Sequence, residues 1–259
     1  MSTAALVWHQ FRYDQKTFWR QPESVFFTVA LPLIFLFLFV SIFGNEDVRI
    51  GPDSEVKGST YYVPGIVTLS MVSATVLNLA IALTFARERG LLKRVRSTPL
   101  PPSVFMAGRI GTATGVTLLL VVAVVLLGRL VYGVTVPTTT LPALALTVLV
   151  GTAAGCALGF ALSTVIPSEG AAPAITNAVI LPLYFFSGIF IPTDDIPEAM
   201  QRVGDVFPVK HLFEAILTAF DPTTTGTGIA WGDLAVIVLW GLFGAVVAVR
   251  RFRWAPRRK

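Results

Sequence analysis

Residues 63–86 read VPGIVTLSMVSATVLNLAIALTFA, and residues 87–102 continue the chain as RERGLLKRVRSTPLPP. The first run carries no charge, and with about 1.5 Å of helical rise per residue it can cross the ~30 Å hydrocarbon core of a bilayer. The second run places five basic residues and three prolines directly behind it. An apolar run with such a flank predicts a membrane-spanning helix that ends at a charged surface.

The composition also indicates a membrane protein. Of the 259 residues, 54% are hydrophobic and only 14% are charged, against about 25% charged residues in an average soluble domain. A large soluble α/β enzyme would show apolar runs of about 4–8 residues between polar turns. The net charge of +5 comes from basic residues beside apolar runs, without a basic face of interleaved aromatic residues. We therefore expect membrane lipid as a partner and no nucleic acid.

Six apolar runs are long enough to span a membrane, and Asp233 lies within the first turn of the last one. They predict transmembrane helices at 25–43, 63–86, 104–127, 141–166, 171–191 and 229–249. The first run exceeds the ~7–15 apolar residues of a signal peptide and has no small-residue cleavage site behind it, so we expect it to stay as an anchor. The expected fold class is an all-α membrane protein in which residues 1–259 form one domain.

Lysine and arginine collect in alternate segments outside the predicted spans. They precede the first span, separate the second from the third and follow the last, whereas the loops after the first and fifth spans are acidic. Positively charged segments near span ends are retained in the cytoplasm. Six spans with both termini in the cytoplasm satisfy every segment.

The first 22 residues predict a helix that lies on the inner membrane surface. Helical spacing puts apolar and basic side chains on opposite sides, and Asp14 departs from this division near the edge of the apolar arc. The alternative is a positive flank that only fixes the orientation. The apolar side contains Ala4, Val7, Trp8, Phe11, Phe18 and Trp19, and the basic side contains His9, Arg12, Lys16 and Arg20.

Residues 87–98 predict a short amphipathic helix at the cytoplasmic surface. The prolines at 99, 101 and 102 cannot continue a helix, so the helix must end before Thr98. The spacing groups Leu91, Leu92 and Val95 on one side and Arg89, Lys93 and Arg96 on another. A basic loop that only enforces the orientation is an equal alternative.

The run RERGLLKRVRSTPL at 87–100 resembles the E-R-E-x-G-(T/L)-L-(x)-x-L-x-x-T-P-L signature of ABC-2 type transporter permeases. The resemblance implies that the segment is the coupling helix that presses on a separate ATP-binding subunit, which would hold the ATP and magnesium. Val95 departs from the signature, where leucine is commoner. The coupling residues implied are Glu88, Arg89, Gly90, Leu91, Leu92 and Val95.

A second stretch, SGIFIPTDDIP at 187–197, resembles the G-x-F-x-P-x-x-x-(L/I)-P pattern of the same family. Asp195 and Glu198 have capping-box spacing around Pro197, so a short helix should start there. Another should follow Pro208, with Leu212, Phe213, Ile216, Leu217 and Phe220 on one face. The resemblance implies that 192–220 forms re-entrant helices that close the outer exit; the alternative is two surface helices covering span ends. Lys210 and His211 are expected to be solvated.

Three polar residues inside the predicted spans suggest a transport path, because polar groups in lipid need partners or a wet cavity. They are Asn78, Thr176 and Asn177, and the resemblance implies a central cavity between the second and fifth spans of two permease copies. Tyr184, Phe185 and Phe186 would offer flat apolar surface to a hydrophobic substrate. The alternative is hydrogen bonding and packing between helices.

Small residues predict close helix packing. Gly151, Gly155 and Gly159 form a stripe on the fourth span, and Gly111 and Gly115 repeat the spacing on the third, so we expect these two spans to pair. Cys156 is the single cysteine, which excludes an intramolecular disulfide. We interpret it as a packing residue. Pro32 and Pro182 are expected to kink their helices.

The sequence contains no phosphate-binding loop, H-E-x-x-H pair or G-x-S-x-G elbow, so we expect no catalytic residue, metal site or cofactor in this chain. The predicted function is the permease of an ATP-driven exporter of hydrophobic or amphipathic compounds in the bacterial cytoplasmic membrane, working with an ATP-binding subunit and a second identical or related permease. The overall pattern is most similar to drug-resistance permeases of the daunorubicin-exporter type.

Other functions remain open alternatives. Polysaccharide or glycolipid exporters have similar length, and a non-transporting scaffold is excluded only by the coupling segment. A proton-coupled carrier would carry ionisable residues at membrane depth. A membrane-embedded enzyme would need clustered His, Asp or Glu, and the chain has only His9 and His211 as histidines.

Overall fold

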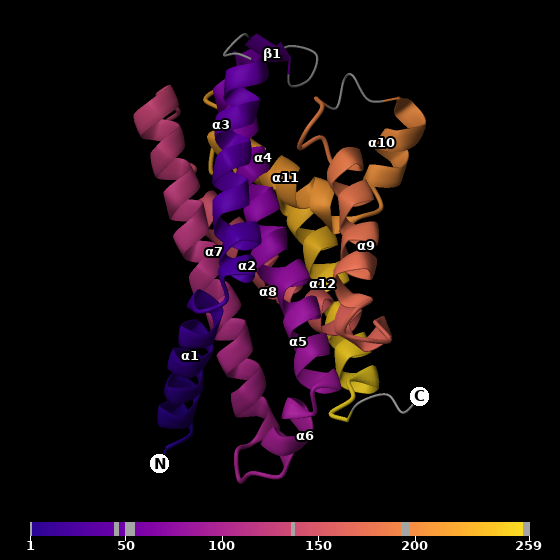
Figure 1. Cartoon of the computed structure of the whole chain (residues 1–259). Coiled ribbons are helices and arrows are strands. Elements are labelled where there is room, and N and C mark those ends of the chain that lie inside the picture. The colour runs from indigo at the N-terminus through magenta and orange to yellow at the C-terminus, as the bar shows by residue number, and fades with distance from the viewer. Residues whose placement is uncertain (1, 44–46, 50–54, 136–137, 193–196, 256–259) are drawn as a thin grey trace.

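The computed structural model of the chain describes residues 2–43, 47–49, 55–135, 138–192 and 197–255. These residues form a bundle of helices with one short β-hairpin (Figure 1), which confirms the all-α membrane class. The N-terminal elements are α1 (Thr3–Trp19), α2 (Pro22–Val25), the π-helix η1 (Phe26–Ala30) and α3 (Leu31–Phe43). The hairpin consists of β1 (Asp47–Arg49) and β2 (Glu55–Lys57).

The second predicted span is one continuous helical rod with a π-helical centre. It consists of α4 (Gly58–Val72), η2 (Ser73–Leu77) and α5 (Asn78–Glu88), and the short α6 (Leu91–Arg96) follows. The later elements are α7 (Pro102–Tyr132), α8 (Leu141–Val165), α9 (Ala172–Phe186), α10 (Glu198–Gly204), α11 (Pro208–Phe220) and α12 (Trp231–Arg251). Each long helix follows an apolar run of the sequence, with boundaries shifted by a few residues.

Five helices of the described chain are long and apolar enough to cross a membrane. They are Pro22–Ile42, Gly58–Glu88, Pro102–Tyr132, Leu141–Val165 and Trp231–Arg251. The remaining predicted span, at 171–191, is represented by α9, whose 15 residues rise only about 22 Å. The chain turns after Phe186, where Gly188 adopts a φ of 83°. The count of six spans therefore stays a prediction.

The bundle has two distinct ends (Figure 1). The start of α1, the helix α6 and the C-terminal end of α12 lie at one end, called the α6 end below. The hairpin and α10 lie at the other, called the hairpin end. The three basic segments of the sequence thus gather at one end, as their charge pattern predicts.

The core surrounds α4, in which Thr60 alone escapes full burial. The amphipathic helix α11 packs against α4, α8 and α12. Its residues Phe213, Ile216 and Phe220 are at most 1% exposed. The predicted apolar face of this helix is confirmed, and α11 fills the interior of the hairpin end.

The helix α10 begins at Glu198, with Pro197 as its N-cap rather than its first helical residue. The predicted capping partner, Asp195, lies outside the described residues. The hairpin, which the sequence analysis did not predict, pairs Asp47 with Lys57 and Val48 with Val56.

The predicted pairing of the third and fourth spans through their glycines is wrong. Gly111 and Gly115 of α7 face Phe11 of α1, and Gly155 and Gly159 of α8 face Thr75 of η2. A small-residue stripe shows that a helix packs closely on something, but its spacing carries no information about which helix that is.

The helix α1 packs along α7 toward the α6 end (Figure 1). Phe18 and Asp14 are buried there, whereas Trp8 and Trp19 are 60% and 45% exposed. The predicted apolar side is therefore divided between a protein contact and an outward surface that could meet lipid. Asp14, the residue that broke the pattern, faces inward, and the depth of α1 in a bilayer stays a prediction.

Candidate functional site

The coupling segment begins where the helix of the second span ends. α5 stops at Glu88, and Gly90 follows with a φ of 72°, a left-handed conformation that glycine adopts without steric penalty. A Cβ at Gly90 would meet no atom of the described chain within 4 Å. The turn itself requires glycine here, and it redirects the chain into α6.

Arg87 anchors this turn to the end of α8. Its guanidinium is 3% exposed and donates to the backbone oxygens of Ser163 at 2.7 Å and Ile166 at 2.6 Å. The last carbonyls of a helix lack partners within the helix and attract cations. Glu88 accepts from Arg87 Nε at 2.7 Å. Sequence reasoning missed Arg87, although a charge at the very end of an apolar run is a usable signal.

Arg89 ties the same turn to the connection between α8 and α9. Its Nε donates to both carboxylate oxygens of Glu169, at 3.0 and 3.1 Å, and its guanidinium lies 5.2 Å from the ring centre of Phe85. The hydrogen bond from Arg89 is the main cause that lowers the pKa of Glu169. Two arginines thus fix the end of α5: Arg87 to the end of α8, and Arg89 to the α8–α9 connection.

The helix α6 has one buried and one exposed side. Leu92 is 1% exposed and packs with Leu83 and Phe105, with Val95 partly buried beside them. Leu91 is 47% exposed, so the predicted grouping of Leu91 with Leu92 and Val95 is wrong, because adjacent helical residues point about 100° apart. The exposed side chains are Leu91, Lys93, Arg94 and Arg96.

Two of the six predicted path residues face the protein interior. Tyr184 is 4% exposed, and its hydroxyl lies 3.4 Å from Ser73 Oγ and 3.3 Å from the backbone oxygen of Leu69. Thr176 is buried and donates to the backbone oxygen of Ala172 at 2.6 Å. Both have the satisfied hydrogen bonds that packing requires.

The other four predicted path residues lie on different surfaces. Asn177 and Phe185 are exposed on the outward side of α9, and Phe186 is half-buried. Asn78 is half-buried and donates from Nδ2 to Thr28 Oγ1 at 3.4 Å. Within one chain the six residues do not form one site, and their role in a path stays a prediction.

A charged cluster at the hairpin end joins α10, α11 and α12. Lys210 is 6% exposed and pairs with Asp205 and, at 3.7 Å, with Glu214. His211 Nδ1 lies 2.7 Å from Asp233. Lys210 and His211 were expected to be solvated, and this expectation is wrong for the buried Lys210. The sequence analysis did not predict this cluster, because Asp233 lies on another helix, far from His211 in the sequence.

The hydrogen-bond partners of His211 favour the protonated form of its ring. Nε2 lies 2.9 Å from the backbone oxygen of Asp205, which can only accept, and Nδ1 faces the carboxylate of Asp233. Nε2 therefore donates, and Nδ1 also donates to Asp233 when the ring is protonated. Burial lowers the pKa of His211, but Asp233, the Asp205 carbonyl and the charge of Glu214 together raise it above its ordinary value.

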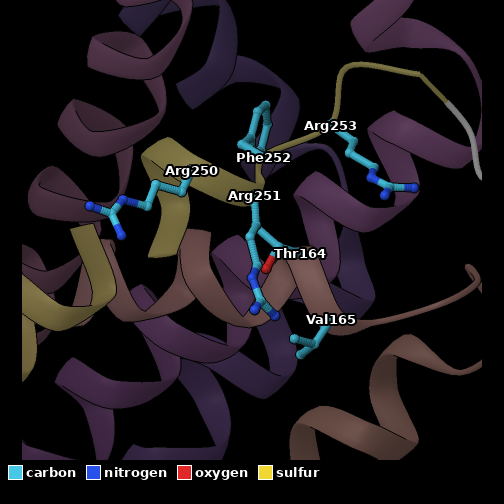
Figure 2. A pocket seen from close by; sticks show the side chains of 6 residues that line it. All are labelled: Thr164, Val165, Arg250, Arg251, Phe252 and Arg253. Atoms are coloured by element: carbon cyan, nitrogen blue, oxygen red, sulfur yellow. The ribbon is translucent and has the colours of Figure 1, made fainter. Parts of the chain in front are cut away.

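A hollow of about 470 Å³ lies where α8 and α12 end, lined by Thr164, Val165, Arg250, Arg251, Phe252 and Arg253. Figure 2 shows Arg251 reaching past Thr164 toward Val165, while Arg250 and Arg253 point away in opposite directions. Because the three guanidinium groups diverge, the hollow is not shaped to grip one anion. It is the positive flank of the last span.

Comparison with known proteins places these features in a family. The sequence model described as ABC-2 type transporter matches residues 2–220. The protein ycf38 of Porphyra purpurea, named as a transport permease, is 25% identical over 224 residues, covering 84% of this chain and 76% of its own.

Two further relatives have names of the same kind. YvfS of Bacillus subtilis, also named as a transport permease, is 22% identical over 198 residues, or 76% of this chain and 78% of its own. The daunorubicin resistance ABC transporter permease protein DrrB1 of Streptomyces coeruleorubidus is 30% identical over 195 residues, or 73% of this chain and 66% of its own.

Proposed function

Because the chain belongs to the ABC-2 type transporter family, we propose that it is the membrane subunit of an exporter that a separate ATP-binding subunit drives. The cargo we propose is a hydrophobic or amphipathic compound, and the site of action is the bacterial cytoplasmic membrane. The name of the relative DrrB1 includes drug resistance, which favours a drug-like cargo over a polysaccharide.

The observation that carries the proposal is the build of the α6 end. α6 presents Leu91, Lys93, Arg94 and Arg96 outward while Leu92 anchors it to the bundle. One apolar side chain among basic ones suits an acidic groove with an apolar floor on a partner. ATP and magnesium would be bound by that partner, because this sequence has no phosphate-binding loop.

The two arginines behind α6 give the proposed partner a mechanical route into the bundle. A push on α6 would act on the turn at Gly90, and Arg87 and Arg89 connect that turn to the end of α8 and to Glu169. Ordered hydrogen bonds to backbone oxygens transmit displacement better than mobile surface contacts. The α8–α9 connection would therefore move together with α6.

A second permease copy would complete the transport path. The outward face of α9 exposes Asn177, Leu181 and Phe185, and a polar residue on an apolar face meets lipid at a cost. Facing a second copy across a central path would give Asn177 a polar surrounding. The exposed face of α9 is accordingly the surface we propose for that contact.

The first experiment is reconstitution of the chain with a candidate ATP-binding subunit. The chain alone should hydrolyse no ATP above background, and the pair should show hydrolysis that rises with an exported amphiphile. Hydrolysis by the isolated chain, free of contaminating enzymes, would contradict the proposal.

A Gly90 series tests the turn separately from docking. Gly90→Asn should retain most of the stimulated hydrolysis, because asparagine tolerates the left-handed region, whereas Gly90→Val should lose most of it. Equal activity of the two variants would show that the φ of this turn is irrelevant to coupling.

Orientation is tested with single cysteines in a Cys156→Ala background. Met200→Cys should react with an impermeant reagent applied to intact cells, and Lys93→Cys should not. Labelling of position 93 from outside would overturn the cytoplasmic placement of α6.

A further inference from the structure

A small cavity of about 120 Å³ lies among α1, the second span and α7 toward the α6 end. Figure 1 shows α1 beside α7 at this end of the bundle, with α6 between the ends of α5 and α7. Gln21, Arg89 and Leu91 line the cavity and are exposed, so they mark its mouth. The mouth therefore touches two of the residues assigned to coupling.

Three buried polar atoms that line this cavity lack hydrogen bonds within the described part of the chain. Asp14 Oδ1, Arg109 Nε and Thr112 Oγ1 form no hydrogen bond with the residues that the structure describes, and all three residues line the cavity. The other carboxylate oxygen of Asp14 accepts from Gln10 at 3.1 Å. A buried polar group without a partner is unfavourable and is normally satisfied by water or a ligand.

The distance between two of these atoms indicates which chemical group can bind beside them. Asp14 Oδ1 and Arg109 Nε form an ion pair at 3.6 Å. This distance is longer than a hydrogen bond, so both atoms can still bond to an oxygen that lies beside the pair. A hydroxyl donates to the carboxylate and accepts from the guanidinium at once. The opposite charges of Asp14 and Arg109 cancel, so an uncharged group fits better than an ion.

The remaining lining and the size of the cavity favour an amphiphile. Phe18, Leu79, Val116 and other apolar residues surround the polar atoms. Sites for whole drug-sized ligands occupy about 300–1,000 Å³, so a cavity of this size admits only the polar end of a larger molecule. The apolar part would remain in the surrounding membrane.

We propose that this cavity binds the uncharged, hydroxylated headgroup of an amphiphile, such as a sugar or glycerol on an apolar chain. The ligand enters from the membrane leaflet at the α6 end. This inference rests on the proposed export function and names the chemistry of its cargo. A bound headgroup lies against Arg89 and Leu91, where it bears directly on the coupling segment.

The test compares two probes on the full chain in phosphatidylcholine nanodiscs. One probe is octyl glucoside below its micellar concentration, and the other is its tetra-O-methyl derivative, which keeps the oxygen acceptors and loses the donors. Saturation-transfer NMR titration measures the affinity for each probe. The wild type should bind octyl glucoside at least tenfold more tightly than the methylated derivative. Equal binding of the two probes would mean that the cavity holds water only and would overturn the site.

Variants test whether the polar atoms of the cavity cause the preference for octyl glucoside over its methylated derivative. Thr112→Val and Asp14→Asn should each reduce it at least fivefold. Thr112→Val removes only a hydroxyl without a partner, so it should fold normally. Thr117→Val is the matched control, because Thr117 has an equally buried unpartnered hydroxyl on α7 but does not line the cavity. A preference that survives both cavity variants, or that Thr117→Val abolishes, would contradict the assignment.

A transport arm distinguishes exported cargo from a resident lipid. In vesicles that contain the ATP-binding subunit, ATP-driven expulsion of the glucoside identifies the ligand as cargo, and binding without expulsion identifies a resident glycolipid. Both results uphold the site. Failure of the subunit to form an ATP-hydrolysing complex would instead overturn the proposed function, and the binding result would stand.

Discussion

The two halves of the second span differ in how they are packed. The half toward the hairpin end, α4, is buried along almost its whole length, with α3, α7 and α11 packed against it. The half toward the α6 end, α5, lines a cavity whose buried polar atoms lack hydrogen bonds within the described chain, and it ends in the turn at Gly90. One helix thus passes from a tightly packed hairpin end to a looser α6 end.

This difference suggests a division of labour along one helix. Alternating access needs one end closed while the other admits cargo. α11, with Phe213 and Phe220 in the core, fills the interior of the hairpin end, and the cavity beside α5 lies toward the α6 end. The region where the partner would push is also the region with the least packing to resist movement.

The largest effect is expected at the packed end. Phe213→Ala removes a ring that is 1% exposed and should lower the free energy of unfolding by about 3–5 kcal/mol. Thermal unfolding in detergent measures the loss. Phe185→Ala is the control, because its ring is 52% exposed and its removal should leave stability nearly unchanged. Equal losses would contradict the packing contrast.

Arg87→Ala should have the next largest effect. It deprives the backbone oxygens of Ser163 and Ile166 of their donor, at about 1–3 kcal/mol for each buried group left unpaired. Stimulated ATP hydrolysis should fall more steeply than stability. Arg202→Ala is the control, because its pair with Glu198 is exposed and contributes at most about 0.5 kcal/mol. An Arg87 variant with normal stability and stimulation would show that this link is dispensable.

A smaller loss of stability is expected from a substitution where α8 touches the π-helical centre of the second span. A Cβ at Gly159 would lie 2.9 Å from the backbone oxygen of Thr75, which cannot move independently, so Gly159→Ala should cost about 1–3 kcal/mol. Gly170→Ala, where a Cβ meets nothing within 4 Å of the described chain, should be neutral. Chemical unfolding of both variants checks this, and a neutral Gly159→Ala would argue against close packing at η2.

The smallest expected effect is a pH dependence of stability that arises from His211 at the hairpin end. The folded pKa of His211 is raised above its ordinary 6.5, so its stabilisation is complete below about 6.5 and disappears as the pH rises through the folded value. The melting temperature should fall over that interval, and Asp233→Asn should flatten the dependence. Partial exposure of His211 keeps the effect small. An unchanged slope in Asp233→Asn would rule out this pair as its origin.

The sequence predicts the helices well, because burial in lipid and helical periodicity act locally. The run at 63–86, the break before the prolines and the apolar face of α11 all follow from residues close together in the chain. The 15-residue length of α9 was missed, since Ile189, Phe190 and Ile191 continue the apolar pattern after the backbone has turned.

The site was less predictable, because its contacts join distant segments. Asp14 was visible as an exception to a pattern, but its neighbour Arg109 lies on another helix and no spacing rule connects them. The same holds for His211 with Asp233 and for Arg87 with the end of α8. Glu88 was assigned to a partner, yet in the structure it accepts from Arg87, and its role toward a partner stays a prediction.

We propose that the exposed side of α6 receives the force of ATP hydrolysis by the partner subunit. The most direct measurement is the rate of amphiphile-stimulated ATP hydrolysis by the reconstituted pair carrying Leu91→Glu and Arg96→Glu. This double variant should lose at least tenfold in stimulation while remaining folded, because it places acidic groups on a surface that we expect to face an acidic groove. Met200→Glu, an exposed site at the hairpin end, should keep the wild-type rate. Wild-type stimulation in the α6 variant would contradict the account.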